Sequence, residues 1–203
     1  PDILSVDEVF SIIKVCTNIR DRVILMLMYD AGLRASEVAH LKAEHIDSHR
    51  MLIKVEQGKG HKDRYVVLSK MMLEHLRLYW KTFHPKHWLF PLRLHPDKSI
   101  HRRFISQIYH QAKKKAGITK NGGAHTLRHC FATHMLEGGT PLDIVQRLLG
   151  HKSLTSTMRY LHLTQQRLDQ VKTPIELFGK LSIKTWPHGT LTNVRQNDAV
   201  VNL

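Results

Sequence analysis

Apolar residues recur at helical spacing in the N-terminal part of the chain. Ser5 and Glu8 have the spacing of a capping box, in which the serine caps a helix and the carboxylate returns to the serine amide. The apolar positions within residues 9–16 keep the helical period, and the same period predicts a second helix over residues 19–30 and a short third one over residues 35–41. The chain is therefore expected to begin with three helices.

The pattern changes to that of β-strands after this helical part. Residues 51–55 and 64–68 are rich in β-branched and aromatic residues, and they flank the turn-forming residues 58–63, Gly-Lys-Gly-His-Lys-Asp. This arrangement predicts an antiparallel hairpin with a basic tip, which a strand near residues 45–48 can extend.

Helical spacing then dominates the chain as far as residue 180. We predict a mainly α fold with a small antiparallel β-sheet (α+β), in which residues 1–180 form one domain. Residues 181–203 have no clear period, which is typical of a flexible C-terminal tail. The further helices are predicted over residues 69–83, 100–116, 125–136 and 142–149, with shorter ones near residue 153 and over residues 164–171.

A large excess of positive charge narrows the choice of partner. The 203 residues include 31 Lys and Arg against 17 Asp and Glu, so the formal net charge is +14. A surplus of this size indicates a polyanionic partner, and nucleic acid is the first candidate. The longest apolar run, residues 23–29, is too short to span a bilayer, so no membrane partner is expected. Cys16 and Cys130 cannot form a disulfide framework, so we expect a reducing, cytoplasmic setting.

Five short segments place cationic or nucleophilic side chains beside glycines or expected helix ends. Each segment alone is compatible with a structural role, because an arginine at a helix start or a lysine in a turn is usually solvated. The segments are Gly32-Leu33-Arg34-Ala35-Ser36-Glu37, Gly58-Lys59-Gly60, His125-Thr126-Leu127-Arg128-His129, Leu149-Gly150-His151 and Arg159-Tyr160. In this order and spacing they resemble the signature of the tyrosine recombinases, the family of phage integrases and their bacterial relatives. The resemblance covers residues 4–178.

The resemblance implies a phosphate clamp made of two arginines and two histidines. Arg34 and Arg128 would grip the scissile phosphate, because guanidinium groups donate paired hydrogen bonds to phosphate oxygens and stay charged at any working pH. His125 would accept a proton or donate a hydrogen bond beside them, and His151 would complete the clamp.

The resemblance also implies a nucleophile and a general acid. Tyr160 would attack the phosphate and form a covalent 3′-phosphotyrosyl intermediate, for which a strongly positive pocket must favour the phenolate. Lys59 on the hairpin tip would protonate the departing 5′ oxygen, with Lys62 as the alternative acid. Because these cations neutralise the developing negative charge, the chemistry implied needs no metal, ATP or other cofactor.

Supporting residues are less sharply defined by the sequence. Glu37 either holds a basic side chain or is a carboxylate favoured by the helix N-terminus, and His129 is a supporting group. His125 and His129 have the spacing of a zinc helix, but Thr126 stands where the glutamate belongs, so no metal site is predicted. Contacts with DNA are predicted for Lys62, Arg64, Arg102, Arg103, Lys113 and Lys114, and for the last four the alternative is a solvated charged face. Core positions are expected for the aromatic residues Tyr65, Tyr79, Trp80, Trp88 and Phe90.

Three functions are consistent with these residues. The first is the catalytic domain of a site-specific DNA recombinase, or integrase, an enzyme that cuts and rejoins strands through the phosphotyrosyl intermediate. The second is a relaxing activity like that of type IB topoisomerases, and the third is a non-catalytic DNA-binding accessory protein, against which the intact catalytic set argues. The resemblance further implies a double-stranded DNA recombination site as partner, a homotetramer on DNA with a monomeric free form, and a cytoplasmic, nucleoid-associated place in a bacterial or phage-like system. It also implies that an N-terminal core-binding domain is absent from this chain.

Overall fold

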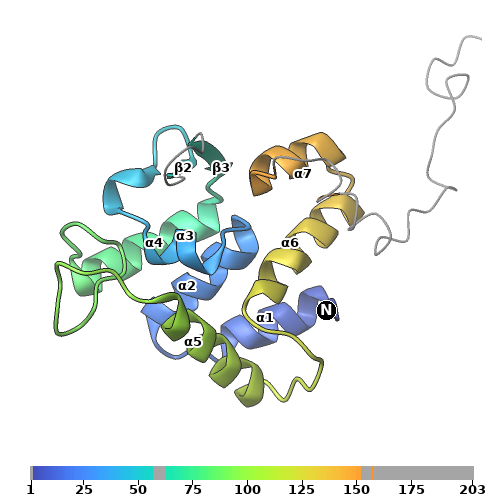
Figure 1. Ribbon diagram of the computed structural model, residues 1–203, viewed down its shortest axis with the longest axis horizontal. Coiled ribbons are helices and arrows are strands. Elements are labelled where there is room, and N and C mark those ends of the chain that lie inside the picture. The colour runs from blue at the N-terminus through green and yellow to red at the C-terminus, as the bar shows by residue number, and fades with distance from the viewer. Residues whose placement is uncertain (1, 57–62, 152–156, 158–203) are drawn as a thin grey trace, which may run out of the picture. The chain divides into compact units, whose positions relative to one another are not determined.

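Seven α-helices and a three-stranded sheet make up the framework of the residues that the structure describes (Figure 1). This computed structural model describes residues 2–56, 63–151 and 157. The elements are α1 (Val6–Lys14), α2 (Ile19–Asp30), α3 (Ala35–Ala39), β1 (Ile46–Asp47), β2 (Leu52–Val55), β3 (Arg64–Val67), α4 (Lys70–Phe83), α5 (Arg102–Lys115), α6 (His125–Glu137) and α7 (Leu142–Leu149), with a short 3₁₀ turn (Ala43–His45) before β1. The hairpin tip, the helices predicted beyond residue 151, the tail and the domain boundary at residue 180 lie outside the described residues.

The start of the chain is fastened to α6 and to the loop before it. The predicted capping box is present, with the Ser5 amide donating to Glu8 Oε2 (2.6 Å) and the Glu8 amide donating to Ser5 Oγ (3.2 Å). Lys120 in the loop also donates to Glu8 Oε2 (2.6 Å), and the Leu4 amide donates to Cys130 Sγ on α6 (3.3 Å). The first turn of α1 therefore braces the segment that leads into α6.

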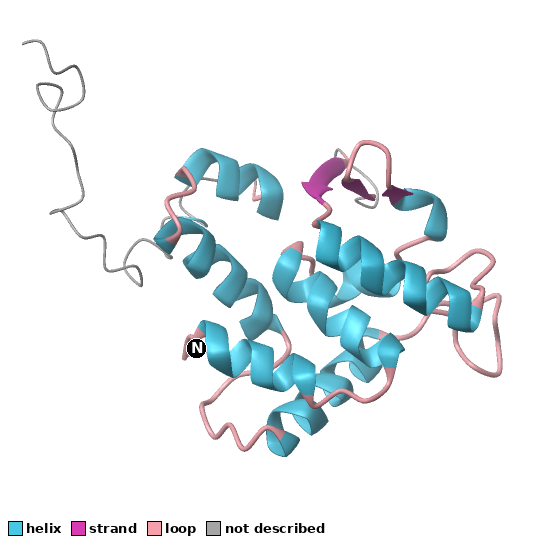
Figure 2. Ribbon diagram, turned by 180° about the vertical axis from the view of Figure 1, so that it is seen from behind, coloured by secondary structure: helices cyan, strands magenta, loops and turns pink. Residues whose placement is uncertain are grey.

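Helix α2 is the centre of the hydrophobic core. Its residues from Val23 to Met28 are buried without a break, which is the pattern of a helix surrounded on all sides. Helices α4 and α6 pack against it, and α1, α3 and α5 also contact it. Figure 2 shows the short strands at one edge of these helices. No helix in the described part of the chain is long and apolar enough to cross a bilayer.

The sheet confirms the predicted hairpin and its extension by a third strand. The strand order is β1-β2-β3, all antiparallel, with Ile53 of β2 opposite Ile46 of β1 and Val66 of β3. On β3, Arg64 and Val66 face inward while Tyr65 and Val67 face solvent. The core position expected for Tyr65 is therefore wrong, because its side of the sheet has no covering layer and Tyr65 is 55% exposed.

The other aromatic residues divide between core and surface. Phe90 and Tyr79 are buried as expected, and Tyr79 donates its hydroxyl to a main-chain carbonyl (2.7 Å). Trp80 is 42% exposed, contrary to the prediction, because one step along α4 turns it away from the face that Tyr79 buries. Trp88 is partly buried.

The end of α2 comes into close contact with α6. Gly32 follows α2 with φ +62°, and a Cβ there would lie 2.5 Å from Phe131 Cδ1, so both the backbone conformation and the space require glycine. The chain then turns directly through Arg34 into α3. This close approach places the first residues of α3 beside α6.

Candidate active site

Three arginines from separate elements converge on the carboxylate of Glu37, in the first turn of α3. Arg64 on β3 forms a bidentate pair with it, Nη1 to Oε1 and Nη2 to Oε2, both 2.8 Å. Arg34 donates its amide to Oε2 and Nη1 to Oε1, also both 2.8 Å. Arg128 Nη1 on α6 lies 3.7 Å from Oε2. We call these four residues the arginine cluster.

The Glu37 carboxyl is held in its ionised form. Burial raises the pKa of this carboxyl, but the hydrogen bonds and charge of Arg64, followed by the Arg34 amide and the charge of Arg128, outweigh burial and lower the pKa to about 2. Three guanidinium groups thus surround one carboxylate, and the cluster keeps a net positive charge. Such a cluster attracts an anion of the charge and shape of a phosphate diester.

Two arginines of the cluster also hold the C-terminal end of α7. Arg128 donates through Nη1 to the Gly32 carbonyl and through Nη2 to the Leu149 carbonyl, and Arg64 Nε donates to the Leu148 carbonyl (2.9 Å). The last carbonyls of a helix have no partner within the helix and lie at the negative end of its dipole, so guanidinium groups suit them well. Arg128 is only 2% exposed, and its orientation is fixed from both sides.

His125 is the first residue of α6 and lies close to the cluster. The residue as a whole is exposed, yet the protein around the ring partly desolvates it and so lowers the pKa of the imidazole. The positive charges of Arg128 and Arg34 lower this pKa further, against the opposing charge of Glu37. The ring therefore stays neutral at neutral pH and is able to accept a proton. The ring of His129 packs edge-on against it, with centroids 5.5 Å apart.

His151 is positioned by the end of α7. Gly150 closes that helix with φ +65°, and the His151 amide donates to the Gln146 carbonyl (3.2 Å). Gln146 Nε2 donates in return to the His151 carbonyl (3.2 Å), and His151 Nδ1 lies 2.9 Å from Thr157 Oγ1. His151 follows Leu149, whose carbonyl accepts from Arg128, by two residues, so the main chain of His151 is tied to the arginine cluster through the end of α7.

Comparison with known proteins identifies the family. The sequence profile of the phage integrase family matches residues 2–167. The chain belongs to the phage integrase family. A putative integrase/recombinase of Sinorhizobium fredii, y4qK, is 44% identical over 183 residues, which make up 89% of this chain and 58% of that relative.

Solved structures of integrase-family recombinases have the same fold. A crystal structure of XerA recombinase is 30% identical, with a TM-score of 0.75 over 81% of this chain and 60% of that one. The crystal structure of XerH site-specific recombinase bound to palindromic difH substrate, a post-cleavage complex, is 25% identical, with a TM-score of 0.73 over 83% of this chain and 52% of that one. The chain thus spans only about half to three fifths of the length of these relatives. The predicted family and fold class are confirmed.

Of the six catalytic residues that the integrase resemblance implies, four are described and lie together. Arg34, Arg128 and His125 surround or adjoin the Glu37 carboxylate, and His151 adjoins Arg128 through the end of α7. Lys59, Lys62 and Tyr160 lie outside the described residues. The roles of these three residues stay predictions. Among the described residues, no group of three His, Cys, Asp or Glu side chains is arranged to hold a metal ion, and the expectation of metal-free chemistry also stays a prediction.

Arg64 has a place in the integrase site that the sequence did not suggest. A contact with DNA is predicted for Arg64, yet the residue is 8% exposed. Its guanidinium donates hydrogen bonds to Glu37 and to the Leu148 carbonyl. Its contacts tie β3, and so the base of the hairpin, to α3 and α7. The alternation of β3, in which Arg64 shares a face with buried Val66, is the sequence signal that could have placed it inside.

The remaining predicted DNA contacts lie at the two ends of α5. Arg102 and Arg103 begin the helix and line a hollow of about 620 Å³ together with Ser36 of α3. Lys113 and Lys114 lie in its last turn, about 15–20 Å away along a helix of 14 residues. Lys114 is exposed and Lys113 half-buried. Arg102 and Arg103 therefore lie near α3, the helix that carries Glu37, whereas Lys113 and Lys114 lie at the opposite end of α5.

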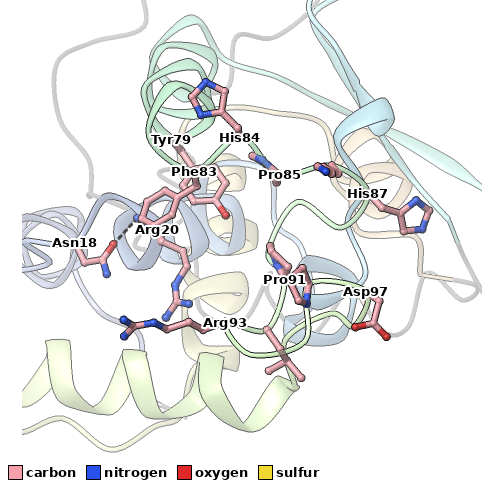
Figure 3. Close-up of a pocket in the computed structure, with 13 residues that line it drawn as sticks. Asn18, Arg20, Tyr79, Phe83, His84, Pro85, His87, Pro91, Arg93 and Asp97 are labelled. Atoms are coloured by element: carbon pink, nitrogen blue, oxygen red, sulfur yellow. Dashed lines mark hydrogen bonds between the residues drawn. The ribbon is translucent and has the colours of Figure 1, made fainter.

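A larger hollow of about 880 Å³ lies between the start of α2, the end of α4 and the loop that follows α4 (Figure 3). Arg20 and Arg93 extend into it, with Tyr79 and Phe83 on another side (Figure 3). None of the site residues predicted from the sequence lines this hollow. The arginine cluster, and not this hollow, is therefore the candidate active site of this integrase-family chain.

Proposed function

We propose that this chain is the catalytic domain of a site-specific DNA recombinase, which cuts and rejoins strands through a covalent 3′-phosphotyrosyl intermediate on Tyr160. The observation that carries the proposal is the arginine cluster, in which Arg34 and Arg128 are oriented by one ionised carboxylate beside His125 and the end of α7. Membership of the phage integrase family and likeness to XerH, solved with its difH substrate, support the same function.

In the proposed reaction, the phenol oxygen of Tyr160 forms a bond to the scissile phosphorus and the bond from phosphorus to the 5′ oxygen breaks. Arg34 and Arg128 donate to the non-bridging oxygens, where negative charge increases in the transition state. His125, kept neutral by its surroundings, accepts the phenol proton, and Lys59 gives a proton to the departing 5′ oxygen. Because the phosphotyrosyl bond keeps the energy of the diester, the 5′ hydroxyl of another strand can reverse the step without ATP.

In the proposed mechanism, Glu37 fixes the orientation of the basic side chains. An arginine side chain has many rotamers, and fixing it in advance lowers the cost of reaching the transition state. The carboxylate receives donors from Arg34 and Arg64 at 2.8 Å and lies near Arg128, so the basic groups are oriented before DNA arrives. The low pKa of Glu37 keeps this arrangement ionised throughout the physiological range.

A nicked suicide substrate tests the proposal. Cleavage beside the nick releases a short fragment, so the covalent protein–DNA complex accumulates and migrates as a larger band on a denaturing gel. We expect this chain to form the covalent complex. Exchange between two DNA sites distinguishes the recombinase from a type IB relaxing enzyme, while the absence of any covalent complex supports the non-catalytic accessory protein.

We also propose the arrangement in which this chemistry takes place. Exchange of two duplexes requires four strand cleavages, so a homotetramer on a double-stranded recombination site is the assembly that fits, with a monomeric free domain. The catalytic domain is proposed to extend over residues 1–180, with residues 181–203 as a tail, in a cytoplasmic, nucleoid-associated protein. The net charge of +14 fits such a partner.

Affinity for duplex DNA is expected to fall steeply with salt. If six or more phosphates are contacted, raising salt from about 50 to about 200 mM should weaken binding roughly a thousandfold, because each contact releases counterions. Fluorescence anisotropy at several salt concentrations gives the slope of log affinity against log salt. Arg103→Gln and Lys114→Gln should each lower the slope by about one if the residue contacts a phosphate. A flat plot for the wild type contradicts the electrostatic account.

Sulfur at the 5′ bridging position of the substrate is expected to rescue Lys59→Ala. A thiolate departs without being protonated, so loss of the general acid no longer slows cleavage. The measurement is the rate of covalent capture with oxygen and sulfur substrates, with Lys62→Ala as the matched variant from the same hairpin tip. If the sulfur substrate rescues only Lys62→Ala, the general acid is Lys62. If it rescues neither variant, both lysines serve DNA binding and not proton transfer.

A further inference from the structure

One side chain outside the arginine cluster contacts a predicted catalytic group directly. His151 Nδ1 lies 2.9 Å from Thr157 Oγ1. Thr157 is fully buried, so water does not compete for its hydroxyl. In the sequence, Thr157 stands three residues before Tyr160. No sequence motif singles out this threonine, and no role was predicted for it.

We propose that Thr157 is a positioning residue, whose hydroxyl donates to Nδ1 of neutral His151 and so leaves the ring hydrogen on Nε2 for the scissile phosphate. The inference rests on the proposed function, because it assigns how one member of the phosphate clamp works. Thr157 acts through His151 and does not itself touch the DNA.

In the proposed arrangement the Thr157 hydroxyl is the donor in its 2.9 Å contact with neutral His151. A neutral imidazole carries one N–H, and a hydroxyl that donates to Nδ1 leaves that hydrogen on Nε2. A protonated imidazole donates from Nδ1, and the same hydroxyl then accepts. In both states Nε2 carries a hydrogen, which is what a group that stabilises a phosphate oxygen needs. The hydroxyl therefore makes the contribution of His151 independent of its charge.

Hydrogen bonds hold both the main chain and the ring of His151. Gln146 holds the main chain of His151 in both directions, and Arg128 holds the Leu149 carbonyl two residues before it. These main-chain bonds fix the position of the backbone but do not set the rotation of the ring. The contact with Thr157 restrains that rotation, because it holds Nδ1 at 2.9 Å from the hydroxyl.

The same hydrogen bond links two parts of the proposed site along the chain. His151 follows the end of α7, and Thr157 belongs to the stretch that continues to Tyr160. A bond between them joins the phosphate clamp to the sequence that carries the nucleophile. Loss of the bond is therefore expected to affect the chemical step more than DNA affinity.

The test compares three variants in single-turnover capture of a suicide substrate at saturating DNA. Thr157→Val removes the hydroxyl at nearly constant volume and should slow capture roughly tenfold or more, with the dissociation constant for DNA unchanged. Thr157→Ser keeps the hydroxyl and should restore most of the rate. Thr133→Val is the matched control, because Thr133 is also buried and its hydroxyl has no hydrogen-bond partner among the described residues. It should capture DNA at the wild-type rate.

A spectroscopic readout separates positioning from simple packing. In wild-type protein labelled with nitrogen-15 at histidine, neutral His151 should show the Nε2–H tautomer, and Thr157→Val should show a mixture of tautomers. Wild-type protein in the Nδ1–H tautomer, or Thr157→Val that captures DNA at the wild-type rate, overturns the proposal. The spectrum of the wild type decides the matter even if Thr157→Val fails to fold.

The two proposals fail in different ways. If wild-type protein captures no DNA, the proposed function is wrong, while the nitrogen-15 spectrum still tests the tautomer. If wild-type protein captures DNA but the hydroxyl makes no difference to rate or tautomer, only the role of Thr157 is wrong.

Discussion

Replacing Tyr160 by phenylalanine is expected to abolish covalent capture of DNA and to leave DNA affinity close to that of the wild type. The substitution removes only the attacking oxygen, since the aromatic ring and the basic side chains of the clamp remain. No other step in the proposed mechanism forms a bond between protein and DNA. The measurement is the covalent band formed with a nicked suicide substrate, read beside a binding isotherm for the same DNA.

A second tyrosine provides the control for Tyr160→Phe. Tyr65 is 55% exposed on β3, the strand that follows the predicted basic tip, so it is the described tyrosine most open to solvent. Tyr65→Phe should capture DNA at the wild-type rate. Capture that persists in Tyr160→Phe and disappears in Tyr65→Phe would transfer the nucleophile to β3 and contradict the proposed site.

Local sequence patterns were sufficient for the elements, and the resemblance to the tyrosine recombinases singled out the two arginines. The capping box of Ser5 and Glu8 is present, α2 and α7 have their predicted bounds, and the hairpin pairs as expected. These features depend on hydrogen bonds and burial within a few residues of each other, which is the range over which sequence patterns carry information. Arg34 lies at the start of α3 and Arg128 in the first turn of α6, both beside the same carboxylate.

The predictions of burial and exposure that differ from the structure have a common physical cause. The period of a strand or helix shows which residues share a face, but not which face another element covers. Tyr65 and Trp80 were therefore expected in the core and are exposed, while Arg64 was predicted to contact DNA and is buried. The contact between Thr157 and His151 joins residues six positions apart, and neither the strand nor the helix period indicates it.

The same limit applies to Glu37, whose two possible roles the sequence could not separate. It is in the first turn of α3, where the helix dipole favours a carboxylate, but its strongest contacts come from Arg64, which is 27 residues away in the sequence. The structure therefore favours the role of holding basic side chains. This role has a measurable consequence for stability.

Glu37→Gln is expected to destabilise the protein by roughly 3 kcal/mol at pH 7. The pKa of Glu37 is about 2 in the folded protein. An unfolded glutamate titrates at about 4.3, and each pKa unit corresponds to about 1.4 kcal/mol. A carboxyl whose pKa is lowered by folding adds stability above the unfolded pKa, and this stability is lost as pH falls through the folded value. The difference in the free energy of unfolding between wild type and Glu37→Gln should therefore be constant above about pH 5 and shrink between about pH 4.3 and 2.

Urea unfolding of both proteins at a series of pH values measures this difference directly. Glu44→Gln is the matched control, because Glu44 is 70% exposed and its one ion pair with a described residue is with Lys42 at 3.5 Å. Surface pairs of that kind contribute at most about 1 kcal/mol, so the control should stay close to the wild type at every pH. A Glu37→Gln protein that is as stable as Glu44→Gln, or a gap that does not narrow on acidification, contradicts the picture of one ionised carboxylate holding three arginines. In that case Arg34 and Arg128 must be oriented by their main-chain and helix-end contacts, and the cluster owes its geometry to α7 instead of Glu37.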